Sequence, residues 1–364
     1  MEPESPLSKL MRERFDPAFG RLARYVAGFD LRRLDPMLVA LAPRRKEAMR
    51  RVIDAVKEPA AAIEEAVIAR DPDAASRFDA IAAEALDQMR SLEPDGVPAS
   101  LGPFNATPLL SALSSIERRL YRDAPEWLDD PSFPEDQRTE ALDRLDRVNR
   151  TLGSYDAFTA LLMPLIEAAE RAGHSPVRVH DLASGHAGFA VLLKQALGDR
   201  VVVEASDIKP EYLEIGRARA AALGVPVDLF VEDALAMDGI RARGVDIVVC
   251  TQALHHFPPG MVARMIGEAS RAATVGACFI DGERSWVLLG AFIPAATLIS
   301  RSRTLVHDGI VSLRRMYYRE ELELLGALAP GVPEGVRVEI GSSPPAHIFV
   351  RLKRDPSRDG GAAQ

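Results

Sequence analysis

The chain has 364 residues, of which 47% are hydrophobic and 27% are charged, and its formal net charge is −8. This length is enough for one large or two medium domains, and the composition is typical of a folded globular protein rather than a collagenous, disordered or membrane-spanning one. Because nucleic-acid binders usually present a basic face, the acidic balance argues against that class of partner.

The cysteines and the apolar runs favour a protein that stays in the reducing interior of the cell. Cys250 and Cys278 lie in strand-like apolar runs and show no metal or disulfide spacing. The first residues lack the apolar stretch and cleavage pattern of a secretion signal. The longest apolar run, Val287 to Ile299, is too short to cross a bilayer. We therefore expect a cytoplasmic protein.

The first part of the chain shows only helical periodicity, with apolar residues three and four positions apart. Helices are expected over Leu7–Leu22, Met49–Val56, Ile63–Ile68, Phe78–Leu86 and Leu110–Tyr121. Proline and glycine interrupt the pattern at residues 93–108 and again at 130–136. The pattern predicts an N-terminal helical domain or cap over residues 1–140.

From residue 141 onward, short β-rich runs alternate with helices. The expected strands are Val177–Leu182, Val201–Ser206, Val227–Val231, Val245–Cys250, Ala277–Asp281, Val336–Ile340 and His347–Leu352. Such alternation is typical of an α/β fold with a parallel sheet between helices, and the last two runs read as an antiparallel hairpin at the sheet edge. We predict this domain over residues 141–354, followed by a flexible tail over 355–364.

A loop of small residues follows the first strand of this domain. The strand ends near Asp181, the loop runs from Ala183 through Gly185 to Gly188, and a helix then begins. Small residues let a ligand approach the backbone, and the N–H groups of a helix N-terminus favour an anionic group. A dinucleotide site requires G-x-G-x-x-G here, and Ala183 replaces its first glycine.

Acidic residues follow the next strands. Asp207 ends the second strand, at the position where a carboxylate binds ribose hydroxyls. Asp233 follows the third strand and Thr251 the fourth. Ligands of open α/β sheets bind at the carboxyl ends of the strands, and core packing does not require polar residues to gather there.

At this point the sequence resembles the class I methyltransferases that use S-adenosylmethionine, in particular the small-molecule branch with an LHHF-type turn, here residues 254–257. The resemblance covers Leu142 to Leu352. It implies a Rossmann-like seven-stranded sheet whose last strand is antiparallel. It departs from the family loop D-x-G-x-G-x-G, because Ala183 and Ala187 replace two glycines. Ala183 is tolerable if its backbone angles stay in an ordinary region.

The resemblance also implies roles for individual residues. Asp207 would bind the ribose diol, and Asp233 would accept a hydrogen bond from the adenine amino group. Arg150 and Tyr155, in the segment before the first strand, would reach the cofactor or the substrate. The cofactor-binding residues implied in this way are Asp181, Ala183, Ser184, Gly185, Gly188, Asp207, Ile208, Asp233, Ala234, Thr251 and Gln252.

Histidines are the candidates for chemistry on the acceptor. His255 and His256 follow the fourth strand, where either could take a proton from a hydroxyl acceptor, and the alternative is that one packs beneath the turn. His307 is a second candidate on the substrate side. No group of aspartates is arranged for a divalent cation, so we expect no metal.

Residues 283–318 form an insertion that is first apolar and then basic. It reads as a lid over an apolar pocket with a cationic rim; the alternatives are a core helix with a solvated flank, or a surface that touches a membrane. The N-terminal helices carry no chemical motif. They are expected to cap the core, to shape the acceptor pocket or to form a homodimer.

The sequence therefore predicts methyl transfer from S-adenosylmethionine to the oxygen, nitrogen or carbon of a small-molecule acceptor. Three alternatives stay open. A nucleic-acid methyltransferase would require Arg301–Arg315 to merge with Arg44, Arg45 and Arg50 into one basic face. A non-catalytic regulatory protein would hold the cofactor beside a blocked acceptor cavity. A dehydrogenase is opposed by the altered loop and the terminal hairpin.

Overall fold

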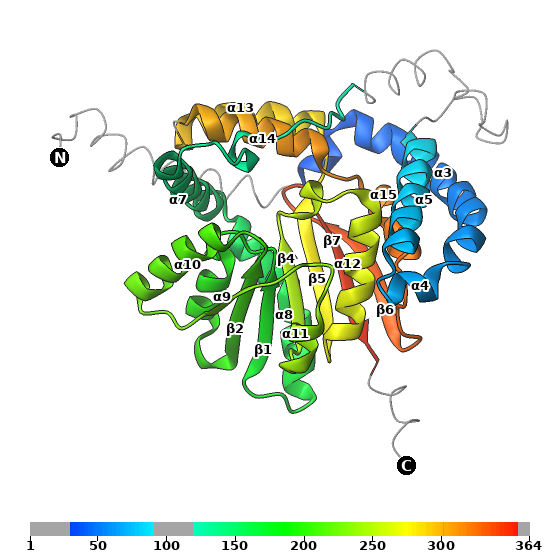
Figure 1. The fold of residues 1–364 in the computed structure, drawn as a ribbon. Helices are drawn as coiled ribbons and strands as arrows, with labels where there is room; N and C mark the ends of the chain where they lie inside the picture. The colour runs from blue at the N-terminus through cyan, green and yellow to red at the C-terminus, as the bar shows by residue number, and fades with distance from the viewer. Residues whose placement is uncertain (1–29, 91–118, 301, 356–364) are drawn as a thin grey trace.

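The computed structural model describes residues 30–90, 119–300 and 302–355. The helices expected over Leu7–Leu22 and over most of Leu110–Tyr121 lie outside the described residues, as does nearly all of the predicted tail. Figure 1 shows a central sheet with helices on both faces, and further helices across one end of the strands. No helix of the described part is both long enough and apolar enough to cross a membrane.

Seven strands form the sheet in the order β3-β2-β1-β4-β5-β7-β6. Their bounds are β1 Val177–Leu182, β2 Val201–Asp207, β3 Asp228–Val231, β4 Ile247–Thr251, β5 Gly276–Gly282, β6 Val336–Ser343 and β7 His347–Arg354. Strands β1 to β5 pair in parallel, whereas β7 pairs antiparallel with both β5 and β6. The predicted seven-stranded α/β fold with an antiparallel last strand is confirmed.

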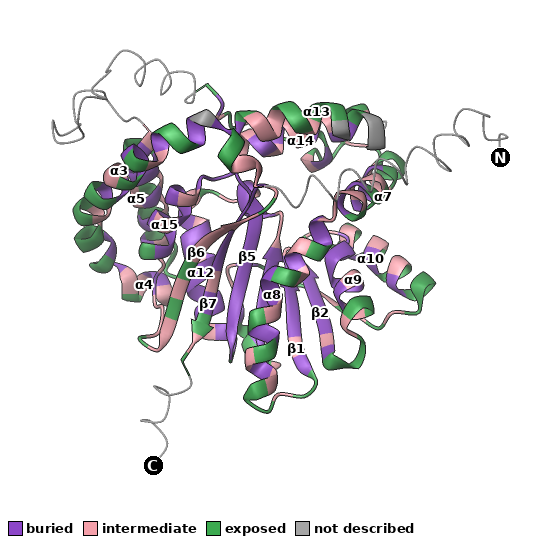
Figure 2. Ribbon diagram, turned by 180° about the vertical axis from the view of Figure 1, so that it is seen from behind, coloured by how far each residue is buried: buried purple, intermediate pink, exposed green. Residues whose placement is uncertain are grey.

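The strands are apolar throughout because each face of the sheet packs against helices (Figure 2). Successive side chains point to opposite faces, so Ile247 and Val249 join one hydrophobic cluster while Val248 and Cys250 join the other. The first cluster includes α8 (Ser154–Arg171) and α9 (Gly188–Leu197), and α10 (Pro210–Leu223) packs on β2 and β3. The second includes α12 (Pro259–Ala272), α15 (Arg319–Ala327) and a residue of the short helix α11 (Asp238–Ala242).

In the described part of the chain, the N-terminal helices share the second cluster rather than forming a core of their own. They are α3 (Pro36–Ala61), α4 (Glu64–Ile68) and α5 (Pro72–Arg90). Phe78 and Leu86 of α5 are buried in the same cluster as Val262 of α12 and Leu325 of α15. The division of the chain at residue 140 stays a prediction, since helix α7 (Glu135–Leu152) runs across it.

The insertion forms two helices, α13 (Trp286–Ser300) and α14 (Arg303–Arg315), which lie across the carboxyl ends of the strands (Figure 1). Helix α13 packs on α14 and α7, and α14 contacts the single turns η5 (Trp127–Asp129) and η7 (Leu254–His256). The α13 sequence has no charged residue, and Trp286 and Ile293 are exposed on it.

A buried ion network joins the N-terminal helices to the chain that leaves β5. The Glu321 carboxylate accepts hydrogen bonds from Arg90 of α5 and from Arg284, each at 2.7 Å. Arg284 is 1% exposed, and its guanidinium lies 4.0 Å from the centre of the Tyr318 ring. Burial alone would raise the pKa of Glu321, but the two guanidiniums lower it to about 2.

Replacing Glu321 by Gln leaves two buried guanidiniums without a countercharge, so the free energy of unfolding should fall by about 3–5 kcal/mol. Urea denaturation at neutral pH measures this loss. The matched control is Glu323→Gln on the same helix, because the Glu323 carboxylate pairs with Arg319 one turn away and that pair should be worth less than about 1 kcal/mol. Equal losses in both variants would show that the network adds nothing.

The same network predicts a sensitivity to acid. The pKa of Glu321 is about 2 in the folded protein against an ordinary value of 4.5, so its stabilising contribution is complete above the ordinary value and disappears as the pH falls toward 2. The difference in stability between the wild type and Glu321→Gln should therefore shrink below about pH 4.5. A difference that stays constant down to pH 3 would contradict this assignment.

Candidate active site

The loop after β1 adopts a backbone that L-residues rarely take. Ala183, Gly185 and Ala187 have φ angles of 51°, 54° and 56°, all in the left-handed region. Ala183 therefore does not meet the condition of ordinary backbone angles under which alanine was considered tolerable at this position. Such conformations cost about 1–3 kcal/mol for a residue with a Cβ atom and persist where surrounding contacts impose them.

One of those contacts comes from Asp207 at the end of β2. Its carboxylate accepts hydrogen bonds from the Gly185 N–H at 2.8 Å and the Lys209 N–H at 2.9 Å. Burial raises the pKa of Asp207 although these donors favour the ionised form. Ile208, directly after Asp207, is 62% exposed, as expected of a side chain left free to contact a ligand.

Asp181 lies beside this loop as a buried carboxyl group. Among the described residues, neither carboxylate oxygen of Asp181 has a hydrogen-bond partner, and the same is true of the Ser184 hydroxyl. Burial, with a contribution from the nearby Asp207 charge, raises the pKa of Asp181 to about 8. Buried polar groups are normally satisfied, so two partnerless groups in one loop mark a place for a ligand that brings donors.

The remaining residues predicted to bind cofactor lie at the same edge of the sheet. Asp233 is exposed after β3, and its carboxylate accepts from the Leu235 N–H, while Ala234 is buried. Thr251 ends β4, and Gln252 follows with a φ angle of 53°. Strands β1, β2 and β3 are neighbours in the sheet. Their carboxyl ends therefore bring Asp181, Asp207 and Asp233 to one rim of the sheet rather than to separate surfaces.

Residues 146–155, which precede β1 in the chain, contact the loop that follows β1. The Tyr155 hydroxyl donates to Asp146 at 2.9 Å, and Arg150 donates to the same carboxylate at 2.8 Å. Asp146 therefore holds two of the predicted substrate residues, Arg150 and Tyr155. The sequence did not indicate Asp146. Tyr155 is only 4% exposed. Asn149 was also missed; its amide donates to the Gln252 side chain at 2.9 Å and ties α7 to the end of β4.

His186, in the loop after β1, is buried close to Tyr155 and Asp146. Its ring is 7% exposed, and Nε2 has no partner among the described residues. Burial lowers the pKa of His186 to about 4, so the ring is neutral at physiological pH.

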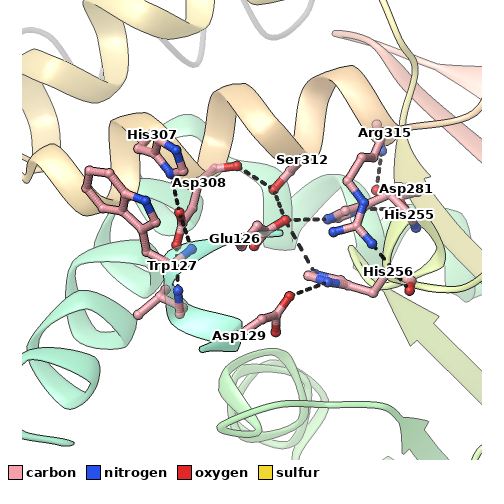
Figure 3. A network of polar contacts seen from close by, with 12 residues as sticks. Glu126, Trp127, Asp129, His255, His256, Asp281, His307, Asp308, Ser312 and Arg315 are labelled. Atoms are coloured by element: carbon pink, nitrogen blue, oxygen red, sulfur yellow. Dashed lines mark hydrogen bonds and ion pairs between the residues drawn. The ribbon is translucent and has the colours of Figure 1, made fainter. Parts of the chain in front are cut away.

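The two histidines after β4 form a cluster with residues that are distant in the sequence (Figure 3). His255 Nδ1 lies 2.9 Å from a carboxylate oxygen of Asp281, the residue near the end of β5. His255 Nε2 and His256 Nε2 lie 3.8 and 3.9 Å from one oxygen of Glu126, and His256 Nδ1 lies 3.4 Å from Asp129. No sequence spacing indicated Glu126, Asp129 or Asp281, because three separate segments meet here.

His307, the other predicted substrate residue, has different neighbours. Its ring stacks on Trp127 at 3.9 Å, and its Nδ1 lies 2.7 Å from Asp308. It lines a cavity of about 260 Å³ together with Arg122, Val311 and Arg314. A second cavity of about 570 Å³ lies where β6 begins and β7 ends, away from the residues described here.

Residues 179–276 match the family model described as a methyltransferase domain. The matched residues include strands β1 to β4 and the loop after β1, so the comparison assigns this part of the sheet to a methyltransferase domain. Demethylmenaquinone methyltransferase of Deinococcus radiodurans is 29% identical over 164 residues, which are 45% of this chain and 59% of that relative. The chain therefore matches about three-fifths of the length of the relative.

Solved structures resemble the chain more distantly. The plantazolicin methyltransferase BpumL in complex with SAH has a TM-score of 0.47 and 12% identity, covering 63% of this chain and 92% of the other. Magnesium protoporphyrin IX methyltransferase from Synechocystis PCC 6803 with bound SAH has a TM-score of 0.38 and 16% identity, covering 65% of this chain and 92% of the other.

Gly188 provides a test of the closed loop. A Cβ atom at Gly188 would lie 2.7 Å from the Tyr155 hydroxyl and 2.9 Å from Asp146. Gly188→Ala should therefore lower the free energy of unfolding by about 1–3 kcal/mol, measured by urea denaturation, and Tyr155→Phe in the same chain should restore part of the loss.

The control for this prediction is Gly290→Ala in helix α13. A Cβ atom there would meet nothing within 4 Å, so this variant should be neutral or slightly stabilising. A Gly188→Ala variant as stable as the control would refute the close approach between the loop and Tyr155.

Proposed function

We propose that this protein transfers the methyl group of S-adenosylmethionine to an oxygen, nitrogen or carbon atom of a small-molecule acceptor. The observation that carries the proposal is the rim formed by Asp181, Asp207 and Asp233 around a loop with partnerless polar groups. Residues 141–354 would form the catalytic domain, with the helices before them as a cap.

The residues of the rim fit the donor. Asp181 and Ser184 lack partners, which suits the amino and carboxyl groups of the methionine part, and the small residues from Ala183 to Gly188 leave the backbone accessible. Asp207 would accept from the ribose diol, with the exposed Ile208 against the adenine. Asp233 and Ala234 would complete the adenine site, and Thr251 and Gln252 would line it from β4.

The donor, when bound, supplies a sulfonium carbon already activated toward displacement. The protein then has to align the acceptor and exclude water. Helices α13 and α14 lie over the rim, which supports the interpretation of residues 283–318 as a lid. The polar side chain best oriented for the acceptor is His255, because Asp281 holds its Nδ1 and leaves Nε2 free to act.

The arrangement of the arginines opposes nucleic acid as the acceptor. Arg44 and Arg45 are 8% and 4% exposed, and Arg45 lies over the Tyr318 ring, so they do not extend a basic face from α14. The partial match to a demethylmenaquinone methyltransferase supports a small-molecule acceptor. Pairing of two copies through the N-terminal helices stays a prediction.

Calorimetry with S-adenosylmethionine and with NAD, run in parallel on the full chain, tests the proposal. We expect the first to bind and NAD not to bind. Asp207→Ala should weaken binding at least tenfold, because it removes both the ribose acceptor and the tether on Gly185. The control is Asp199→Ala, since Asp199 is fully exposed and precedes β2 at the opposite edge of the sheet.

Binding of NAD without binding of S-adenosylmethionine would overturn the assignment. With binding established, the acceptor can be sought by incubating the protein with donor labelled in its methyl group and with phenols, polyketides or amines. Label that appears in an organic product with the wild type but not with Asp207→Ala would support methyl transfer. Donor binding without transfer to any of these acceptors would favour a regulatory protein.

A further inference from the structure

We propose that Glu126, His255 and His256 bind a divalent metal ion of the zinc type beside the methyl-transfer site. These three residues form the group of potential metal ligands found in the described part of the chain, with one ligand atom from each lying within 4.8 Å of the others. Two imidazole nitrogens and one carboxylate oxygen are the ligands that many catalytic zinc sites use.

The orientation of the two rings points to this site. Each histidine has its Nδ1 beside a carboxylate, His255 beside Asp281 at 2.9 Å and His256 beside Asp129 at 3.4 Å. Metal-binding histidines are commonly held in this way, because a hydrogen bond from Nδ1–H to a carboxylate fixes the tautomer whose Nε2 carries a lone pair. Both Nε2 atoms then point to the same oxygen of Glu126 (Figure 3).

The carboxylate at the centre of the cluster has only a neutral hydrogen-bond donor. Glu126 is 8% exposed, and among the described residues no lysine or arginine pairs with it; its one hydrogen bond comes from the Ser312 hydroxyl at 2.6 Å. His255 is 5% exposed, and its Nε2 has no hydrogen-bond partner in the described part. The Glu126 oxygen that faces both Nε2 atoms is therefore bonded only by a neutral hydroxyl, and a cation between the three side chains would balance its buried charge.

The distances suit an ion after small side-chain movements. Zinc bonds of about 2.0–2.1 Å in a tetrahedral arrangement place ligand atoms about 3.3 Å apart. The observed separations of 3.8 and 3.9 Å are too long for hydrogen bonds and exceed this spacing by about half an ångström. A cation at the centre would draw the three side chains together.

Three protein ligands leave at least one coordination position open, as in catalytic rather than structural zinc sites. The cluster follows Thr251 and Gln252 at the end of β4, so an acceptor hydroxyl bound at the open position would lie near the donor and would lose its proton more readily. This role for the ion rests on the proposed methyl transfer, but its binding does not. In this arrangement His255 binds the ion instead of acting as the general base.

Metal content and affinity test the proposal on the full chain prepared without a histidine tag. After incubation with Zn²⁺ and desalting, elemental analysis should find about one zinc per chain. Replacing zinc by Co²⁺ should give the visible absorption bands of a low-symmetry cobalt site. Glu126→Gln and His256→Ala should each weaken zinc binding at least tenfold, and Asp281→Asn, which only positions His255, should weaken it by about 10–100-fold.

The control for metal binding is His174→Ala. His174 pairs with Asp246 away from the cluster, so this variant should bind zinc as the wild type does. Calorimetry with S-adenosylmethionine on every variant checks folding independently of the metal. The metal site alone would be overturned if the protein binds S-adenosylmethionine but no zinc. It would also be overturned if Glu126→Gln and His256→Ala bind zinc as the wild type does. If the wild type does not bind S-adenosylmethionine, the proposed function is overturned instead.

Discussion

The buried carboxylate of Glu321 connects the N-terminal helices to the segment that leads from the sheet into the insertion. It holds Arg90, from the N-terminal helices, and Arg284, from the chain that has just left β5. Arg284 follows Asp281 by three positions and precedes α13. The ion network therefore fixes the point from which the insertion crosses the strand ends.

Two kinds of chemistry meet at the carboxyl edge of the sheet. On the β1–β3 side, acidic residues and a strained loop of small residues suit a ligand with many donors. On the β4–β5 side, two histidines face a buried glutamate that comes from a distant segment. Gln252 lies between the two sides, where its side chain accepts from Asn149 and its backbone N–H bonds to Ile280 of β5. The two sides are thus joined by short, hydrogen-bonded connections.

Much of the fold was predictable because its signal is local. The strand Val177–Leu182 was predicted with the observed bounds, and a helix was expected to begin after the loop at Gly188, where α9 begins, since such patterns are read over a few residues. The rim of Asp181, Asp207 and Asp233 was also predictable, because parallel strands bring their carboxyl ends to one edge. The left-handed backbone at Ala183 was not, because long-range contacts impose it against the preference of alanine. Glu126 gave no signal either, since its side-chain neighbours come from η7 and α14, which are distant in the sequence.

The hydrophobic cluster shared by α5, α12 and α15 has a consequence for how the protein is made. Helices α3 to α5 leave the ribosome first, yet the strands and helices that bury their apolar side chains are translated later, up to residue 352. At about 5–20 residues per second, this delay lasts roughly ten seconds to a minute. During that time the nascent chain carries an uncovered apolar stripe. These helices can bury their apolar side chains within the chain only after the later strands and helices have been made.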